Sequence, residues 1–254
     1  YDLLEILIMK KIVSLVAVAT LSMGSASAFA WTPCPVSHAE LQAALNLAVQ
    51  SPNGGFNLDM WGTVVNRDGA VCAVAKATNV NTGNSPADPW PASRVISAQK
   101  ANTANSLSGI NNTFSTGMLQ GTGSSASSLV GLQFSNPVAT NVGYRGDPAV
   151  YGTVTDPMNG LKVGGINIFG GGFALYNAGG NVVGGIGVSG DTSCADHSVG
   201  WRTREALATA VTGVEGSAAT PNSDVIDVNY PACGVSGEAA GMIAASISGF
   251  VGTP

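Results

Sequence analysis

The hydrophobic and polar positions of this chain follow two periods that alternate along it. Apolar residues recurring every three to four positions, or a helix-start signal, predict helices over 37–49, over 93–107 and from Asp191 or Thr192 through Val211. Short apolar runs flanking a turn predict two β-hairpins, 60–65 with 70–77 and 173–176 with 182–188. This order of helices and hairpins is an α+β pattern with antiparallel strands.

Polar residues mark where the first two helices begin. Ser37 lies three residues before Glu40, which is the spacing of a capping box. Ser93 is expected to cap the second helix, and Gly109 is expected to end it. These local signals support the helical assignment independently of the apolar spacing.

Three glycines, Gly184, Gly185 and Gly187, interrupt the last predicted strand. Glycine weakens a strand because it adds no side chain to the packing and costs conformational entropy. We therefore expect something to approach this strand closely, which can be another backbone, a helix or a ligand.

The segment 109–163 is read as an insertion into a single domain that spans 31–254. Ser, Thr, Gly and Asn dominate 111–128, which predicts a long excursion over the surface. A C-terminal extension is expected from about residue 206, with a strand near 223–230 and a terminal helix within 233–249.

The first 30 residues have the pattern of a leader with a secretory signal peptide. Lys10 and Lys11 follow Met9, the expected start, an apolar run covers 12–23, and Ala28 to Ala30 form an A-x-A site. Cleavage before Trp31 predicts a periplasmic or secreted protein, without a membrane span in the mature chain.

Cysteine usage and charge narrow the class of protein. Four cysteines, Cys34, Cys72, Cys194 and Cys233, suggest two disulfides in an exported chain, and three pairings are open. Their wide spacing argues against a zinc ribbon or a thioredoxin-type redox pair. The net charge is −5 and no basic stripe is present, so nucleic acid is not an expected partner.

Several of these segments resemble the GlcG/HbpS-like family, which includes the C-terminal domain of PduO-type adenosyltransferases. The similarity is carried by Pro89–Ser93, Gln99–Ala101, Gly170–Tyr176, Val182–Gly190 and Asp196. The resemblance implies a profilin-like sandwich, in which helices cover the faces of a central antiparallel sheet. It also implies homo-oligomers and, for some members, haem as the cofactor.

The two histidines are the candidate metal ligands. His197 follows Asp196 at the start of a predicted helix, where its imidazole can ligate haem iron with Asp196 orienting the ring. The alternative is a polar residue of the first turn that faces water. His38 follows Cys34 by four residues, but two ligands do not make a closed site, and a disulfide at Cys34 removes one of them.

Other candidates are contacts to a ligand's carboxylates. The turn that contains Gly171 and Gly172 exposes backbone N–H groups, as does the helix start after Gly190. Arginine pairs with a propionate through two hydrogen bonds. The side chains expected at such a site are Lys100, which matches the family's helix lysine, Tyr144, Arg145, and Arg202 or Arg204. The alternative for Lys100 is a side chain that lies along its helix.

These observations favour an exported, oligomeric protein that binds haem or a related tetrapyrrole as a carrier, buffer or sensor component. A small-molecule enzyme or accessory subunit that uses the same pocket, and a structural oligomerisation module, are the alternatives. Hydrolase chemistry is disfavoured because no G-x-S-x-G elbow is present.

Overall fold

The computed structural model describes residues 32–56, 58–77, 90–123 and 127–216, together with Ala219 and Asp224. The chain divides into two units, 1–31 and 32–254, and all described residues belong to the second. Its elements are α2 (His38–Ala48), β1 (Trp61–Asn66), β2 (Val71–Lys76), α3 (Ser93–Leu107), α4 (Met118–Thr122), α5 (Thr140–Gly143), the 3₁₀ turn η1 (Pro148–Val150), β3 (Gly172–Tyr176), β4 (Val182–Ser189) and α6 (Ser193–Ala210). The expected leader, the strand at 223–230 and the terminal helix lie outside the described residues, Asp224 excepted.

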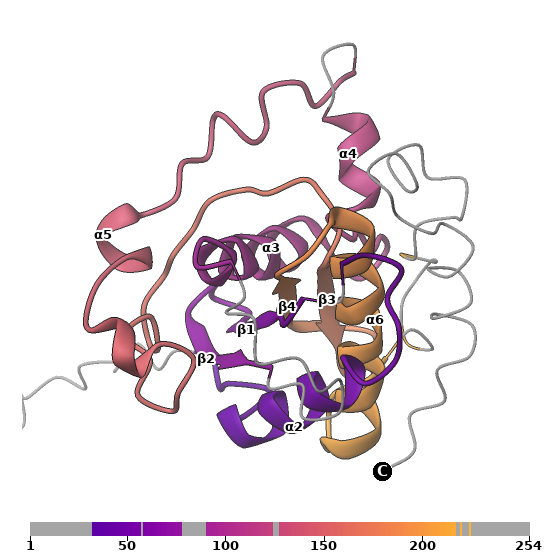
Figure 1. Ribbon diagram of the computed structural model, residues 1–254. Helices are drawn as coiled ribbons and strands as arrows, with labels where there is room; N and C mark the ends of the chain where they lie inside the picture. Colours follow the sequence, from indigo (N-terminus) through magenta and orange to yellow (C-terminus); the bar gives the residue numbers. More distant parts are fainter. Residues whose placement is uncertain are drawn as a thin grey trace, which may run out of the picture. The chain divides into compact units, whose positions relative to one another are not determined.

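The two predicted hairpins join into one antiparallel sheet of four strands in the order β2-β1-β4-β3 (Figure 1). The outer strands β2 and β3 each pair with their hairpin partner, and β1 pairs with β4 at the centre. The predicted α+β fold, a sandwich around a central antiparallel sheet, is confirmed.

Helices cover both faces of this sheet. Side chains alternate across β4, so Ile186 and Val188 face α2 and α6, whereas Gly185 and Gly187 face α3. A Cβ atom at Gly187 would lie 2.0 Å from the carbonyl oxygen of Ser97 on α3. Gly185 and Gly187 therefore admit a helix, whereas a Cβ at Gly184 would lie 2.2 Å from the carbonyl oxygen of Val65 on β1. A helix and another backbone, two of the three expected causes, both apply.

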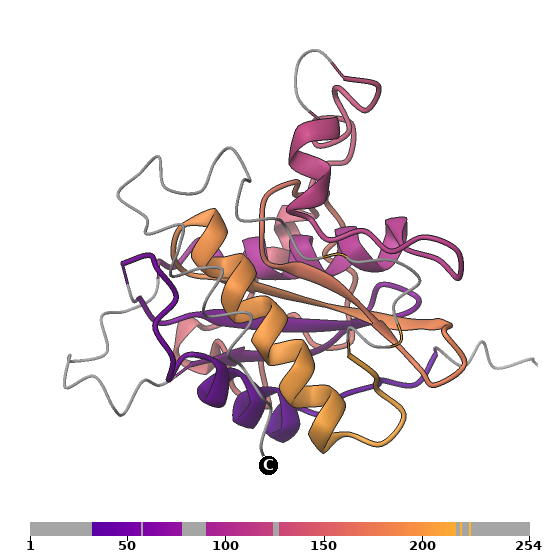
Figure 2. The same cartoon turned by 90° about the vertical axis from the view of Figure 1, so that its right-hand side faces the viewer.

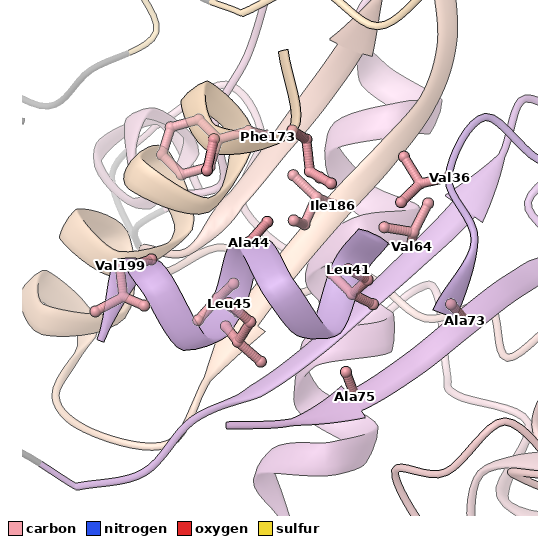
Figure 3. Packing of buried hydrophobic residues seen from close by; sticks show 14 of the residues in the cluster. Val36, Leu41, Ala44, Leu45, Val64, Ala73, Ala75, Phe173, Ile186 and Val199 are labelled. Carbon is pink, nitrogen blue, oxygen red and sulfur yellow. The ribbon is translucent and has the colours of Figure 1, made fainter. Parts of the chain in front are cut away.

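The larger core lies between the sheet and the α2–α6 pair (Figures 2 and 3). Phe173 and Ile186 come from the sheet, Leu41 and Leu45 from α2, and Val199 from α6. The apolar residues that recur through 37–49 lie on the buried face of α2. Burial of this face explains why the segment is helical.

Local capping matches the sequence at α2 and differs at α3. The Ser37 side chain and the Glu40 side chain exchange hydrogen bonds with each other's backbone N–H, which confirms the capping box. At α3, Ser93 is the first helical residue and is buried, and the N-cap Ala92 makes no side-chain bond. The prediction that Ser93 caps α3 is therefore wrong by one position.

The segment 109–163 is more than a surface excursion. Met158 and Val163 are buried against α3 and the sheet in a second core. The Arg94 guanidinium of α3 binds the buried Asp156 carboxylate and the carbonyl oxygen of Gly143, which ties the segment to the domain. The polar composition did not reveal this anchoring, because a few apolar residues and one buried ion pair provide it.

The structure shows one disulfide between two of the four cysteines. Cys34 and Cys72 form a disulfide that ties the chain ahead of α2 to β2. Cys194 is disulfide-bonded as well, and Cys233, the fourth cysteine of the chain, lies outside the described residues.

Candidate functional site

Lys100 and Asp196, both predicted site residues, meet in the interior of the domain. Lys100 extends from α3 past β4, and its Nζ donates to an Asp196 oxygen at 2.7 Å and to the carbonyl oxygen of Val188 at 3.1 Å. The Ser189 hydroxyl lies 3.3 Å from Nζ and donates to the same Asp196 oxygen. Neither charged side chain is exposed to solvent. The ion pair therefore links α3 and α6 across the glycine-containing strand.

Burial shifts the ionisation of both partners. Loss of hydration raises the pKa of Asp196 to about 6, although Lys100 and the backbone N–H of Asp191 oppose the shift. The same loss of hydration lowers the pKa of Lys100 against the pull of the carboxylate. The half-buried ring of Phe169 covers the ammonium group, with Nζ 4.5 Å from the ring centroid. Lys100 thus reaches into the domain and does not lie along the surface of its helix.

The backbone N–H groups expected to bind an anion are taken by the chain itself. The N–H groups of Gly190 and Asp191 both donate to Asp196, each at 2.9 Å. In the glycine turn, the Gly170 N–H donates to the Ser193 hydroxyl and the Gly172 N–H to the Thr116 hydroxyl. Gly171 takes φ +118, and a Cβ there would lie 2.2 Å from the carbonyl oxygen of Val188. The turn is packed, so Gly171 and Gly172 line no open pocket in this structure.

His197, the predicted iron ligand, is fully buried and does not face water as its alternative reading required. Its ring packs against Phe173 with centroids 4.6 Å apart and an interplanar angle of 47°. Burial lowers the pKa of His197 to about 3, with Arg204 and Lys100 acting in the same direction and Asp224 against it. The imidazole is neutral at pH 7, which is the form that ligates iron.

Arg204 completes the surroundings of the Phe173 ring. Its guanidinium carbon lies 4.8 Å from the ring centroid, and its two Nη atoms bind the two oxygens of Asp224 at 2.5 and 2.9 Å. Both partners are buried. The spacing of Arg204 from His197, seven residues on one helix, was a usable sequence signal, whereas nothing local pointed to Asp224.

Arg202, the other predicted arginine, points elsewhere. Its Nη1 donates to the carbonyl oxygen of Ser51 beyond the end of α2, and its Nε to that of Ser198. Loss of hydration lowers the pKa of Arg202 to about 10, and no carboxylate among the described residues opposes this. Arg202 supports the contact between α6 and the end of α2 and lies apart from Phe173.

The remaining candidates are dispersed. The His38 ring lies 2.9 Å, through Nε2, from the carbonyl oxygen of Gly152, away from Phe173 and His197. Tyr144 and Arg145 are exposed at the end of α5, with Tyr144 at 59% exposure. Within the described ranges, no three His, Cys, Asp or Glu side chains are grouped closely enough to hold a metal ion. None of the described helices has both the length and the apolar character of a membrane span.

A family model described as "haem degrading protein HbpS-like" matches residues 37–203, which include the sheet, α2, α3 and the first part of α6. The chain belongs to the HbpS-like family. No curated protein matches this HbpS-like chain. A crystal structure described as a PduOC–haem complex shares 17% identity at a TM-score of 0.42, over 65% of this chain and 87% of its own. The Klebsiella pneumoniae protein ORFY, assigned to family model DUF336, shares 20% identity at a TM-score of 0.41, over 69% and 92%.

Proposed function

We propose that this HbpS-like protein binds haem or a closely related tetrapyrrole. The observation that carries the proposal is the family match, which spans the sheet, α2, α3 and most of α6. These residues make up most of the packed domain, so the match concerns most of the described fold and not a short motif.

The chemistry of the residues around Phe173 fits such a group. A neutral imidazole at His197 is an iron ligand, the guanidinium of Arg204 suits a propionate, and the Phe173 ring suits a flat macrocycle. Haem would supply the iron centre. His197, Arg204 and Phe173 are all fully buried, and Phe173 belongs to the hydrophobic core, so this packing would have to open before haem could reach them.

Two further parts of the proposal concern where the protein acts and how it assembles. The leader pattern in residues 1–30 and the Cys34–Cys72 disulfide both support export to an oxidising compartment. Exposed apolar side chains support self-association: Val130 is 58% exposed and Phe134 87% exposed.

Haem titration of the purified protein, followed by the Soret band, tests the proposal. We expect wild type to give a saturable band, which His197→Ala shifts or removes and which His38→Ala leaves unchanged. The two substitutions remove the same group, so His38→Ala controls for non-specific loss of an imidazole. Absence of a saturable band in wild type at micromolar haem would rule out the binding function.

The family description also favours a second function, the breakdown of haem. In that case the bound Soret band is expected to decay when a reductant and oxygen are added, faster than that of free haem. A band that persists under these conditions supports a carrier or sensor component.

A further inference from the structure

We propose that Lys100 and Asp196 condense into an isopeptide bond, an amide between their side chains, which joins α3 to α6 covalently. The freshly folded protein holds the two groups as the ion pair described above, and the bond forms as the folded protein ages. The reaction needs neither haem nor a second protein, so it is independent of the binding function proposed above.

The amine and the carboxyl group are held close to reacting distance by the fold. Nζ of Lys100 lies 2.7 Å from Oδ2 of Asp196, so the carboxyl carbon, one C–O bond further, lies at most ~3.9 Å from Nζ. Reacting atoms in a productive geometry are ~3–3.5 Å apart. A small movement of the flexible lysine stem therefore brings Nζ onto the carboxyl carbon.

Water is kept away from both groups. Neither side chain has any exposed surface, and the Phe169 ring covers Nζ. The turn at Gly171 packs so closely that a Cβ there would lie 3.1 Å from Nζ. A dry interior favours a reaction that releases water. Groups oriented in this way also reach effective concentrations of ~10⁵–10⁸ M, far above that of the water that would reverse the reaction.

The pair has a direct route from the ionic form to the reactive form. Only a neutral amine carries the electron pair that attacks, and only a neutral acid loses its oxygen as water. Both arise when one proton passes from Nζ to Oδ2 along the hydrogen bond that joins them, without exchange with solvent. Burial lowers the cost of this transfer, because it disfavours both charged forms.

The second oxygen of Asp196 is placed where the charge of the intermediate develops. Oδ1 accepts hydrogen bonds from the backbone N–H groups of Gly190 and Asp191, each at 2.9 Å. When Nζ attacks the carboxyl carbon, negative charge moves onto Oδ1. Preorganised N–H donors at ~2.7–3.1 Å from such an oxygen are the usual means of stabilising a tetrahedral intermediate. The start of α6 therefore supplies an oxyanion hole for this reaction.

Ser189 provides a path for the remaining proton. Its hydroxyl lies 3.3 Å from Nζ and 3.2 Å from Oδ2, so it accepts a proton from the attacking nitrogen and passes its own to the departing oxygen. Oδ2 leaves as water, Oδ1 becomes the amide oxygen, and one C–N bond replaces one C–O bond without any redox change. The N–H left on the nitrogen can donate to the carbonyl oxygen of Val188, which lies 3.1 Å from Nζ.

Intact-mass measurement of the full chain, repeated while the folded protein is incubated at neutral pH, tests the proposal. We expect wild type to become lighter by the mass of one water molecule. Lys100→Arg keeps the cation but offers no amine that can be acylated, so it should keep its full mass. Wild type held in urea should also keep its full mass, because the unfolded chain does not hold the two groups together.

Tryptic digestion after reduction of the disulfides locates the bond. Trypsin does not cleave after an acylated lysine, so the digest should contain a branched peptide in which 95–145 is joined to 163–202. Fragmentation of this peptide should place the link between Lys100 and Asp196. The digest uses wild type alone, so it decides the question even if Lys100→Arg does not fold.

Ser189→Ala tests the proton path, with Ser198→Ala as the matched control. Ser198 is also buried, and its hydroxyl has no hydrogen-bond partner within the described part of the chain. We expect Ser189→Ala to form the bond ~100-fold more slowly, and Ser198→Ala to form it at the wild-type rate. Equal rates in the two variants would overturn the role of Ser189.

Other results would overturn the bond itself. If wild type keeps its full mass and its peptides end at Lys100, the two side chains do not condense. A loss of water that also appears in Lys100→Arg, or that maps to a succinimide at Asp68–Gly69, belongs to other chemistry. Haem binding is measured separately by the Soret band, so failure of the bond leaves the proposed function standing.

Discussion

Replacing Gly187 with alanine tests the closest packing in the domain, where α3 lies on β4. A Cβ at this position would lie 2.0 Å from the carbonyl oxygen of Ser97 and 2.5 Å from the backbone nitrogen of Ala101, whereas ordinary contacts begin near 3.4 Å. The neighbours are backbone atoms of a helix and cannot rotate away. We expect α3 to be pushed from the sheet by about 1.4 Å at this point.

The displacement reaches the buried ion pair, since α3 also carries Lys100. The Nζ atom of Lys100 lies 2.7 Å from Oδ2 of Asp196, and lengthening this distance by the same amount breaks the hydrogen bond between them. Overpacking costs ~1–3 kcal/mol, and stretching the buried pair adds to this cost, by less than the ~3–5 kcal/mol expected when one partner is removed. Partial relaxation recovers some of this, so we expect Gly187→Ala to lower the free energy of unfolding by about 3 kcal/mol or more.

Urea unfolding followed by circular dichroism measures this loss, with Gly109→Ala as the matched control. Nothing lies within 4 Å of a Cβ at Gly109, so this substitution should stay within ~0.5 kcal/mol of wild type. With a slope of ~2 kcal/mol per molar urea, the midpoint of Gly187→Ala should fall by ~1.5 M. Equal midpoints for the two variants would refute the packing argument.

Three further predictions concern buried charge and the disulfide. Because the folded-state pKa of His197, about 3, lies below the ordinary 6.5, its stabilising effect is complete above pH 6.5 and is lost on acidification. Denaturant titrations at pH 7 and pH 5 should show that wild type loses ~2 kcal/mol more of its free energy of unfolding than His197→Gln does. If the two proteins differ by the same amount at both pH values, the lowered pKa of His197 is refuted. The raised pKa of Asp196 gives the opposite slope in both proteins, since its protonation stabilises the folded state as the pH falls through about 6. Lys100→Met leaves the buried Asp196 carboxylate without its cation, so it should lower the free energy of unfolding by ~3–5 kcal/mol at pH 8. The loss should be smaller at pH 5, where the carboxyl is protonated. A loss that does not change with pH contradicts this prediction. Cys34→Ser/Cys72→Ser opens a loop with a sequence separation of 38 and should cost ~4 kcal/mol in chemical unfolding. A thermal and chemical stability equal to wild type would show that the crosslink is dispensable.

The secondary structure could be predicted because its signals are local. The capping box at Ser37, the apolar runs 60–65 and 70–77 on either side of a turn, and the apolar spacing of 37–49 each act over a few residues, and each coincides with an observed element. Ser93 shows the limit of such signals. A serine near a helix start suits the cap and the first turn alike, and the burial of Ser93 placed it inside.

The candidate site could be predicted only in part, because its pairs join distant segments. Lys100 and Asp196 were both selected, but their sequence separation of 96 gave no sign that they bind each other. The glycines of β4 indicated a close approach without saying that α3 makes it at Gly185 and Gly187 and that β1 makes it at Gly184. Arg204 had a visible relation to His197, while its partner Asp224 follows from tertiary packing alone.

The division of charged side chains between interior and surface determines how the protein interacts with charged resins and membranes. Of the ten Lys and Arg residues in the chain, four lie in the interior: Arg94, Lys100, Arg202 and Arg204. Two more, Lys10 and Lys11, belong to the expected leader. Five aspartates, Asp59, Asp156, Asp191, Asp196 and Asp224, are buried as well, so the charges of the interior nearly cancel. The net charge of −5 therefore lies mostly outside, and the protein should be retained by anion-exchange resins at neutral pH and repelled by anionic lipid headgroups.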